Sequence, residues 1–372
     1  MPDLFEQTAI GSMVLANRFV RSATNEGLAD AEGRATPELT AVLAGLARGG
    51  VGLIVSGHAF VSPEGRAGPR QLAADSDDCL PGLARLADEV HAAGGKIALQ
   101  LAHAGLFAKP ARKDLLPVGP SAPDFDSDLN AAPLDVSGIA RVVDAFAAAA
   151  RRARAVGFDA VQIHCAHTYL LGQFISPFFN KRTDGYGGGT ENRSRLPVEV
   201  VRAVREAVGG GYPVLAKLNC DDFLPGGLTP GEALAVACRL EASGLEAVEL
   251  SGGSVAKAAT FASARPRNLH DPEKEAYYRE AARDFKRTLK IPVMLVGGMR
   301  RLETCRELVR DGVADYVAIC RPLICEPGLI ARWRDGGGAM AKCTSDNLCY
   351  GPIRSGKGMY CVTFAGARSA NS

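Results

Sequence analysis

The chain has 372 residues, 47% of them hydrophobic and 23% charged, so it can bury a large core without requiring two domains. Its net charge is +2 and its Lys and Arg residues are scattered, which argues against nucleic acid as a partner and against a basic membrane anchor. No apolar run approaches the roughly 18 residues of a membrane span, and residues 1–8 lack the order of a signal peptide, so we expect a soluble cytoplasmic protein, free to form a homo-oligomer.

From residue 17 onward, short apolar segments alternate with longer segments whose apolar residues are spaced three and four apart, as in strands followed by helices. We predict strands at residues 19–23, 52–56, 96–101, 160–164, 214–218, 247–250, 293–296 and 316–319. The predicted helices are 36–48, 80–93, 138–156, 196–208, 230–242, 274–289, 301–310 and 327–334. This pattern predicts an α/β fold, a closed (β/α)8 TIM barrel with its site at the C-terminal strand ends. An open doubly wound sheet is the alternative, although no Gly-x-Gly-x-x-Gly follows the first strand.

Three segments depart from the barrel pattern. Residues 104–136 and 172–192 each follow a strand, so we expect rim insertions that act as lids or pocket walls. Residues 339–372 contain three cysteines and several glycines without helical periodicity. We therefore predict a barrel domain over residues 1–338 and a C-terminal extension over residues 339–372 packed on it.

Two histidines and a tyrosine follow the fourth predicted strand. Val161 and Ile163 alternate with polar residues, so His164 is expected to face the barrel interior, with His167 and Tyr169 in the next turn. Two imidazoles can hold a carbonyl or nitro oxygen that gains negative charge, while a phenol delivers a proton nearby. A metal is the rival interpretation of His-x-x-His, but no nearby carboxylate completes a zinc shell, and capping or core histidines are the third.

Two further polar side chains fall in the inward phase of predicted strands. Gln100 is out of phase with its apolar neighbours, and so is Lys217 on its own strand. A flavin ring would satisfy both, because an amide can bond the pyrimidine edge and a lysine can offset the charge of a reduced ring. A backbone-bonded amide and an internal ion pair are equally good explanations.

The last two predicted strands end in a possible anion site. Gly297 and Gly298 follow the seventh strand, and Cys320 and Arg321 follow the eighth, where barrels commonly bind phosphate. Glycines at such a place also serve ordinary tight turns. Glycine-containing turns at Gly57 and after Ser251 leave room for a flat ring, or are simply turns.

Taken together, these residues resemble the Old Yellow Enzyme family of FMN-dependent NAD(P)H oxidoreductases, and the resemblance covers most of the chain. The matching motifs are Leu4-Phe5, Asn17-Arg18-Phe19-Val20, Ser62-Pro63-Glu64-Gly65-Arg66, Gln100-Leu101-Ala102-His103-Ala104-Gly105, Val296-Gly297-Gly298 and Arg321-Pro322. The most specific motif is Arg182-Thr183-Asp184-Gly185-Tyr186-Gly187-Gly188 with Glu191-Asn192-Arg193, which looks like the family's signature loop.

The resemblance implies roles for individual residues. His164 and His167 would bind the substrate oxygen and Tyr169 would donate the proton. The residues implied at the FMN site are Ala23, Asn25, Gly57, Gln100, Lys217, Ser251, Gly297, Gly298, Cys320 and Arg321. The implied reaction is reduction of an activated alkene with NADH or NADPH.

Three interpretations stand beside alkene reduction. The same flavin could carry out oxidative dehydrogenation or demethylation of a small amine. The barrel could instead bind a sugar phosphate without a flavin, or bind flavin as a noncatalytic electron-transfer partner.

The sequence departs from the family pattern at four positions near the expected site. Asn25 stands where relatives often have Thr or Cys, and Leu106 stands where Arg often follows. Cys320 and Thr168 each replace a frequent Gly. The family pattern therefore does not predict how the Tyr169 side chain is oriented beside Thr168.

The C-terminal cysteines resemble those of the iron-sulfur branch, which includes 2,4-dienoyl-CoA reductase. That branch supplies four cysteines, whereas Cys343, Cys349 and Cys361 are joined here by Asp346 at the expected second position. Three thiolates and a hard carboxylate suit a [4Fe-4S] cluster poorly, so we expect neither that cluster nor another metal. Reduced thiols are expected elsewhere in so large a chain.

Overall fold

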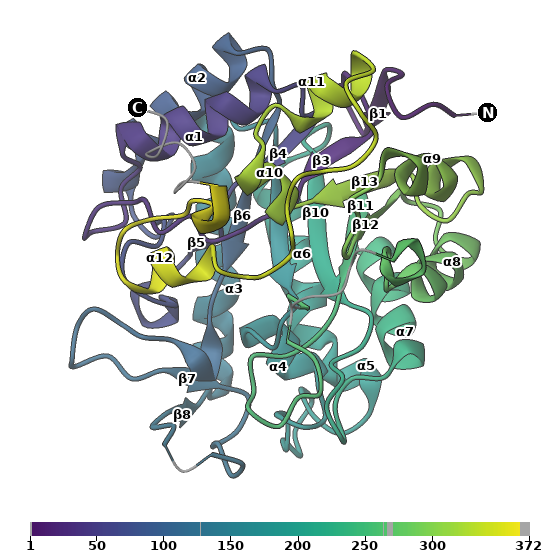
Figure 1. Cartoon of the computed structure of the whole chain (residues 1–372). Coiled ribbons are helices and arrows are strands. Elements are labelled where there is room, and N and C mark those ends of the chain that lie inside the picture. Colours follow the sequence, from purple (N-terminus) through teal and green to yellow (C-terminus); the bar gives the residue numbers. More distant parts are fainter. Residues whose placement is uncertain (1, 127, 263, 266–270, 365–372) are drawn as a thin grey trace.

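A closed barrel of parallel strands, surrounded by helices, forms the body of the molecule (Figure 1). The computed structural model describes residues 2–126, 128–262, 264–265 and 271–364. The barrel strands are β3 (Phe19–Arg21), β4 (Leu53–Val55), β6 (Ile97–Ala102), β9 (Ala160–Cys165), β10 (Val214–Asn219), β11 (Ala247–Ser251), β12 (Val293–Val296) and β13 (Tyr316–Ile319). The sheet closes because β4 pairs with both β3 and β6. The predicted barrel and each predicted strand are confirmed.

The helices outside the barrel follow the predicted pattern closely. They are α1 (Pro37–Arg48), α2 (Leu80–Ala92), α3 (Val136–Ala155), α6 (Arg195–Val208), α7 (Pro230–Glu241), α8 (Arg279–Thr288), α9 (Leu302–Arg310) and α11 (Leu329–Arg334). Side-chain caps fix several starts, as where Thr229 and Glu232 form a capping box at α7. The prediction that one helix begins at residue 274 is wrong. Extended backbone at Glu275 delays α8, and the Glu275 carboxylate accepts the backbone amides of Arg300 and Arg301 instead.

Shorter elements complete the chain. They are β1 (Thr8–Ile10), β2 (Met13–Leu15), β5 (Ala59–Phe60), β7 (Val118–Gly119), β8 (Ala132–Pro133), α4 (Leu170–Ile175), α5 (Thr190–Arg193), α10 (Arg321–Cys325), α12 (Tyr350–Arg354) and 3₁₀ turns at Pro63–Gly65, Asp77–Cys79, Gly105–Phe107 and Pro272–Lys274. No helix in the described part of the chain is long and apolar enough to cross a membrane.

The interior of the barrel changes from apolar to polar along its axis. At the N-terminal end, the β1–β2 hairpin packs Ile10, Met13 and Leu15 against inward side chains such as Val20 and Leu53. Val161 and Ile163 pack instead with residues of the surrounding helices, as their phase on β9 predicts. The hairpin therefore seals one end with apolar contacts, and the polar inward residues gather toward the other.

The C-terminal extension crosses the open end of the barrel (Figure 1). The amide of Ala341 donates to the carbonyl of Arg300 after β12, and the amide of Met359 donates to the carbonyl of Glu26 after β3. Between these anchors the chain forms α12, although the sequence shows no helical periodicity there. The extension therefore does more than pack beside the barrel. The division at residue 338 stays a prediction.

Candidate active site

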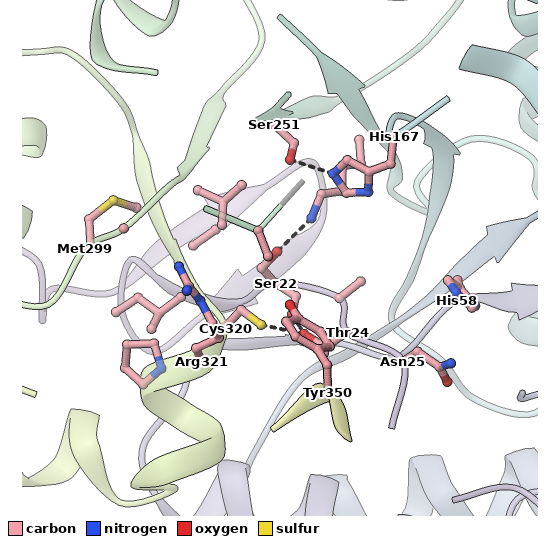
Figure 2. Close-up of a pocket in the computed structure, with 18 of the residues that line it drawn as sticks. Ser22, Thr24, Asn25, His58, His167, Ser251, Met299, Cys320, Arg321 and Tyr350 are labelled. Carbon is pink, nitrogen blue, oxygen red and sulfur yellow. Dashed lines mark hydrogen bonds between the residues drawn. The ribbon is translucent and has the colours of Figure 1, made fainter. Parts of the chain in front are cut away.

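A cavity of about 390 Å³ opens at the C-terminal ends of the strands, within the size range of small-molecule sites (Figure 2). The predicted residues that line it are Ala23, Asn25, Gln100, His164, His167, Tyr169, Lys217, Ser251, Gly298, Cys320 and Arg321. Gly57 and Gly297 are not among the described residues of its wall. Residues 104–136 and 172–192 contribute no described lining residue either, so the prediction that these insertions wall the pocket is wrong for this cavity, and their role as lids stays a prediction.

The wall is built instead by segments that sequence reasoning passed over. The C-terminal extension supplies Ser345, Tyr350 and Arg354, and Figure 2 shows Tyr350 beside Thr24 and Cys320. The segment after β11 adds Val255 and other residues, including Tyr277 and Tyr278. Tyr277, Tyr278 and the residues of the extension are more than 20 positions from the nearest preceding strand end, so no local pattern marks them, whereas Val255 follows β11 by four residues.

Gly57 has a structural reason for lying outside the cavity. Its amide donates to Glu26 Oε1 at 3.0 Å, and a Cβ added there would lie 2.0 Å from Glu26 Oε2. Glu26 in turn forms a buried salt bridge of 2.7 Å with Arg21. Gly57 thus makes room for an internal ion pair. At Gly297 the carbonyl accepts the Tyr277 amide, and Gly298, with φ of +82°, is the one of the pair that reaches the cavity.

A connected polar layer lies on the inside of the barrel. Gln100 Nε2 donates to Gln162 Oε1 at 2.7 Å, and Gln162 Nε2 donates to Glu249 Oε2 at 2.9 Å. Lys217 Nζ lies 3.0 Å from Glu249 Oε1 and 2.7 Å from Ser22 Oγ. The inward orientation predicted for Gln100 and Lys217 is confirmed, and Lys217 also has the internal ion pair that was its alternative explanation.

Glu249 was missed, although the sequence carried the signal. On β11 it is out of phase with Val248 and Leu250, as Lys217 is on β10. Parallel register then sets Glu249 directly beside Lys217. The same alternation that selected Lys217 would have selected its partner.

Four aromatic rings form a cluster over the polar layer. The ring of His164 lies 5.2 Å from that of His167 and 5.1 Å from that of Tyr169, centroid to centroid. His58, from the turn after β4, completes the cluster, with Nε2 3.4 Å from the Tyr169 hydroxyl. The predicted trio therefore does converge, and His58 is an additional member that sequence reasoning treated only as part of a turn.

Hydrogen bonds orient the two predicted imidazoles differently. Nδ1 of His164 accepts the Ala166 amide at 3.4 Å, which assigns the ring proton to Nε2 and makes His164 a donor. Nε2 of His167 lies 2.8 Å from Ser251 Oγ, and a dashed line marks this hydrogen bond in Figure 2. Burial lowers the pKa of both rings well below the usual 6.5, aided by the nearby positive charge of Lys217. Both are neutral hydrogen-bonding groups at neutral pH.

The turn between the histidine and the tyrosine is held from the side. His167 and Thr168 both have φ of +56°, a conformation that favours glycine. The Thr168 hydroxyl lies 2.8 Å from Ser254 Oγ and accepts the Val255 amide at 3.3 Å. These bonds to the segment after β11 explain how threonine is tolerated where glycine would be unstrained.

Arg321 is a buried guanidinium without a carboxylate partner in the described part of the chain. The described acceptors of its N–H groups are neutral oxygens, among them Asn347 Oδ1 at 2.6 Å and the Ser345 carbonyl at 3.4 Å. A buried cation is costly unless an anion compensates it. Arg321, which lines the same cavity as Gly298, therefore fits a phosphate, and the polar layer fits a flat heteroaromatic ring. The described residues suit FMN.

Asp346, which stands among the C-terminal cysteines, holds the extension together by hydrogen bonds. Asp346 Oδ2 accepts the hydroxyls of Thr344 at 2.7 Å and Thr363 at 2.5 Å, and Oδ1 accepts the Leu348 amide at 3.0 Å. The carboxylate is thus used to fold the extension. Among the described residues, no group of three or more His, Cys, Asp and Glu side chains is placed to hold a metal ion.

Comparison with known proteins decides the family. The sequence profile of the NADH:flavin oxidoreductase / NADH oxidase family matches residues 3–337. The chain belongs to this family. The match confirms the Old Yellow Enzyme resemblance, the class of NAD(P)H-dependent flavin oxidoreductases, and FMN with a nicotinamide reductant.

Individual relatives span the chain to different extents. An NADH oxidase of Thermoanaerobacter brockii is 36% identical over 357 residues, covering 94% of this chain and 54% of that protein. A 4,4'-dithiodibutanoate disulfide reductase of Rhodococcus erythropolis is 34% identical over 384 residues, covering 95% of this chain and 94% of that protein. The solved structure of an Old Yellow Enzyme homologue from Zymomonas mobilis aligns with a TM-score of 0.77 and 28% identity, over 91% of this chain and 94% of that one. The chain thus spans about half of the first relative and nearly all of the other two.

Proposed function

We propose that this protein reduces the C=C bond of activated alkenes, such as enones and enoyl-type substrates, with NADH or NADPH. The observation that carries the proposal is the ring cluster of His164, His167 and Tyr169 at the end of β9, facing the polar layer of Gln100 and Lys217. Bound FMN would supply the hydride that is added to the β-carbon of the alkene. A cytoplasmic location suits a reaction that consumes NADH or NADPH.

The neutral histidines suit the activation of a carbonyl. With its proton on Nε2, His164 can donate to the substrate oxygen as that oxygen gains negative charge. His167 stands at the neighbouring position, braced by Ser251. Because burial holds the pKa of both rings low, the oxygen meets neutral imidazoles and not fixed cations.

Tyr169 suits the delivery of a proton to the α-carbon. Burial raises the pKa of Tyr169 to about 12, so the phenol keeps its proton at neutral pH. His58 Nε2 lies 3.4 Å from the hydroxyl and helps to orient the phenol.

The charge of the cavity favours alkene reduction over amine oxidation. Its lining includes Lys217, Arg300, Arg321 and Arg354, and no Asp or Glu among the described residues. An ammonium substrate would therefore enter a site without a compensating carboxylate. Product analysis distinguishes the two reactions when enones are offered to FMN reduced anaerobically by each nicotinamide and N-methyl amines are offered to oxidised FMN.

Replacement of Tyr169 by Phe tests the assignment of the proton donor. We expect alkene reduction to slow by about 100-fold or more, the usual worth of a general acid, while flavin reduction by NADH or NADPH is unchanged. Stopped-flow measurement of the two half-reactions gives both rates. Tyr186→Phe is the control, because its hydroxyl contacts Glu199 outside the cavity. Full alkene reduction by the Tyr169→Phe protein would remove Tyr169 from the scheme.

A further inference from the structure

Glu249 is a carboxylate with no exposed surface in the middle of the polar layer. Its two oxygens have different partners. Oε1 takes Lys217 Nζ at 3.0 Å and Ser22 Oγ at 2.6 Å, and Oε2 takes Gln162 Nε2 at 2.9 Å. Such a carboxylate is tolerated only because every contact is a donor. Nothing in the chemistry proposed above uses it.

The charge on Glu249 fixes the direction of the amide chain that leads to the cavity. A carboxylate only accepts hydrogen bonds, so Gln162 must turn its NH2 group toward Glu249. The Gln162 oxygen then faces Gln100 and receives its NH2 group at 2.7 Å. The Gln100 oxygen is therefore left as an acceptor at the cavity, where the imide N–H of a flavin needs one.

The same carboxylate limits the positive charge that Lys217 presents. Lys217 lines the cavity, and its register on β10 places it directly beside Glu249 on β11. A cation beside the pyrimidine edge of a flavin stabilises the negative charge that reduction creates. With Glu249 at 3.0 Å, most of that positive charge is offset.

We propose that Glu249 is a positioning residue for the FMN ring, which orients Gln100 through Gln162 and lowers the reduction potential of the flavin by offsetting Lys217. The proposal rests on FMN binding and not on the substrate. Its measurements need no alkene, so it can fail while the proposed alkene reduction stands, and the reverse.

Glu249→Gln removes the charge and keeps the shape. We expect the reduction potential of the bound FMN, measured by dye equilibration, to become more positive because Lys217 is no longer offset. We also expect FMN to bind the apoprotein about tenfold more weakly, because Gln100 can turn its NH2 group toward the flavin imide and one hydrogen bond to the ring is then lost. A wild-type value of either quantity, or a potential that moves to more negative values, would overturn the proposal.

Two further variants keep the test decisive if Glu249→Gln does not fold. The double variant Lys217→Met with Glu249→Gln removes both charges and keeps the layer neutral. Its potential should stay close to wild type if Glu249 offsets Lys217, and a clearly more negative potential would overturn that role.

Gln162→Leu breaks the amide chain and spares the ion pair, so it should weaken FMN binding with little change in potential. Unchanged binding would overturn the role of the chain.

Glu246→Gln is the matched control. Glu246 precedes β11 by one residue, at the sealed end of the barrel, and pairs with Arg205 outside the cavity. Its loss removes a carboxylate three residues from Glu249, so a general loss of stability would appear in both variants. A potential shift in Glu246→Gln equal to that in Glu249→Gln would overturn the proposal.

Discussion

Thr168 shows how single side chains hold the reacting groups in place. Its backbone has φ of +56°, yet its side chain is fully buried and bonds Ser254 and Val255. The strain of this conformation is of order 1–3 kcal/mol, similar to what two buried hydrogen bonds return. Thr168 thereby connects the segment after β11 to the turn that contains His167 and Tyr169. This connection holds Tyr169 in place although the usual glycine is absent.

Substitution of Thr168 separates the hydroxyl from the backbone conformation. Thr168→Ala retains the strained conformation and loses the hydroxyl's hydrogen bonds to Ser254, Val255 and the His167 carbonyl, so we expect the free energy of unfolding to fall by about 2 kcal/mol. Thr168→Ser keeps the hydroxyl and should cost less than about 1 kcal/mol. Denaturant unfolding of the two proteins measures the difference. Equal stabilities would show that the hydroxyl does not hold the turn.

At the scale of elements, the C-terminal extension replaces the rim insertions as a wall of the site. Asp346 ties together Thr344, Thr363 and the Leu348 amide, and the neighbouring Asn347 contacts Arg321. The carboxylate that stands at a cysteine position of the iron-sulfur branch thus organises the extension by hydrogen bonds. The extension in turn places Tyr350 in the cavity.

Asp346→Ala should loosen the extension without touching the barrel. We expect FMN to bind several-fold more weakly, because Arg321 loses the support of Asn347, and we expect faster proteolysis within residues 339–364. Titration of the apoprotein with FMN and limited proteolysis measure these effects. Asp335→Ala is the control, since the described partner of the Asp335 carboxylate is the exposed Arg334, just before the extension. Wild-type affinity and wild-type proteolysis together would contradict the role of Asp346.

The elements that the sequence predicts well are those with a strong local period. Buried parallel strands require apolar residues on both faces, so the exceptions, such as Gln100 and Lys217, stand out by phase alone. The same rule would have found Glu249. The extension could not be predicted in this way, because Asn347 and Arg321 are 26 residues apart and meet only after the barrel has formed. The prediction that the rim insertions wall the cavity is wrong for a related reason. Their position after a strand shows that they start at the C-terminal end of the barrel, but it does not show in which direction they fold from there.

At the scale of the whole molecule, the fold concentrates unprotonated histidines in its interior. The apolar hairpin closes one end of the barrel, and the C-terminal extension crosses the other. His58, His164 and His167 line the cavity between the apolar core and the extension. Burial lowers the pKa of all three. Their protonation therefore couples to unfolding of the whole barrel and not to a local opening of a surface loop.

Stability should therefore fall as the pH drops through the histidine range. In the unfolded chain these histidines take up protons near pH 6.5, whereas in the folded chain their lowered pKa values keep them neutral. The unfolded state binds more protons, so the stabilisation is complete above about pH 7.5 and is lost below 6.5, with a slope of about 1.4 kcal/mol per pH unit for each histidine. Urea unfolding between pH 8 and pH 5.5, with FMN saturating throughout, measures this slope. His167→Asn should reduce the slope by the contribution of one histidine, about 1.4 kcal/mol per pH unit. An unchanged slope in that variant would show that His167 is not held neutral by the fold.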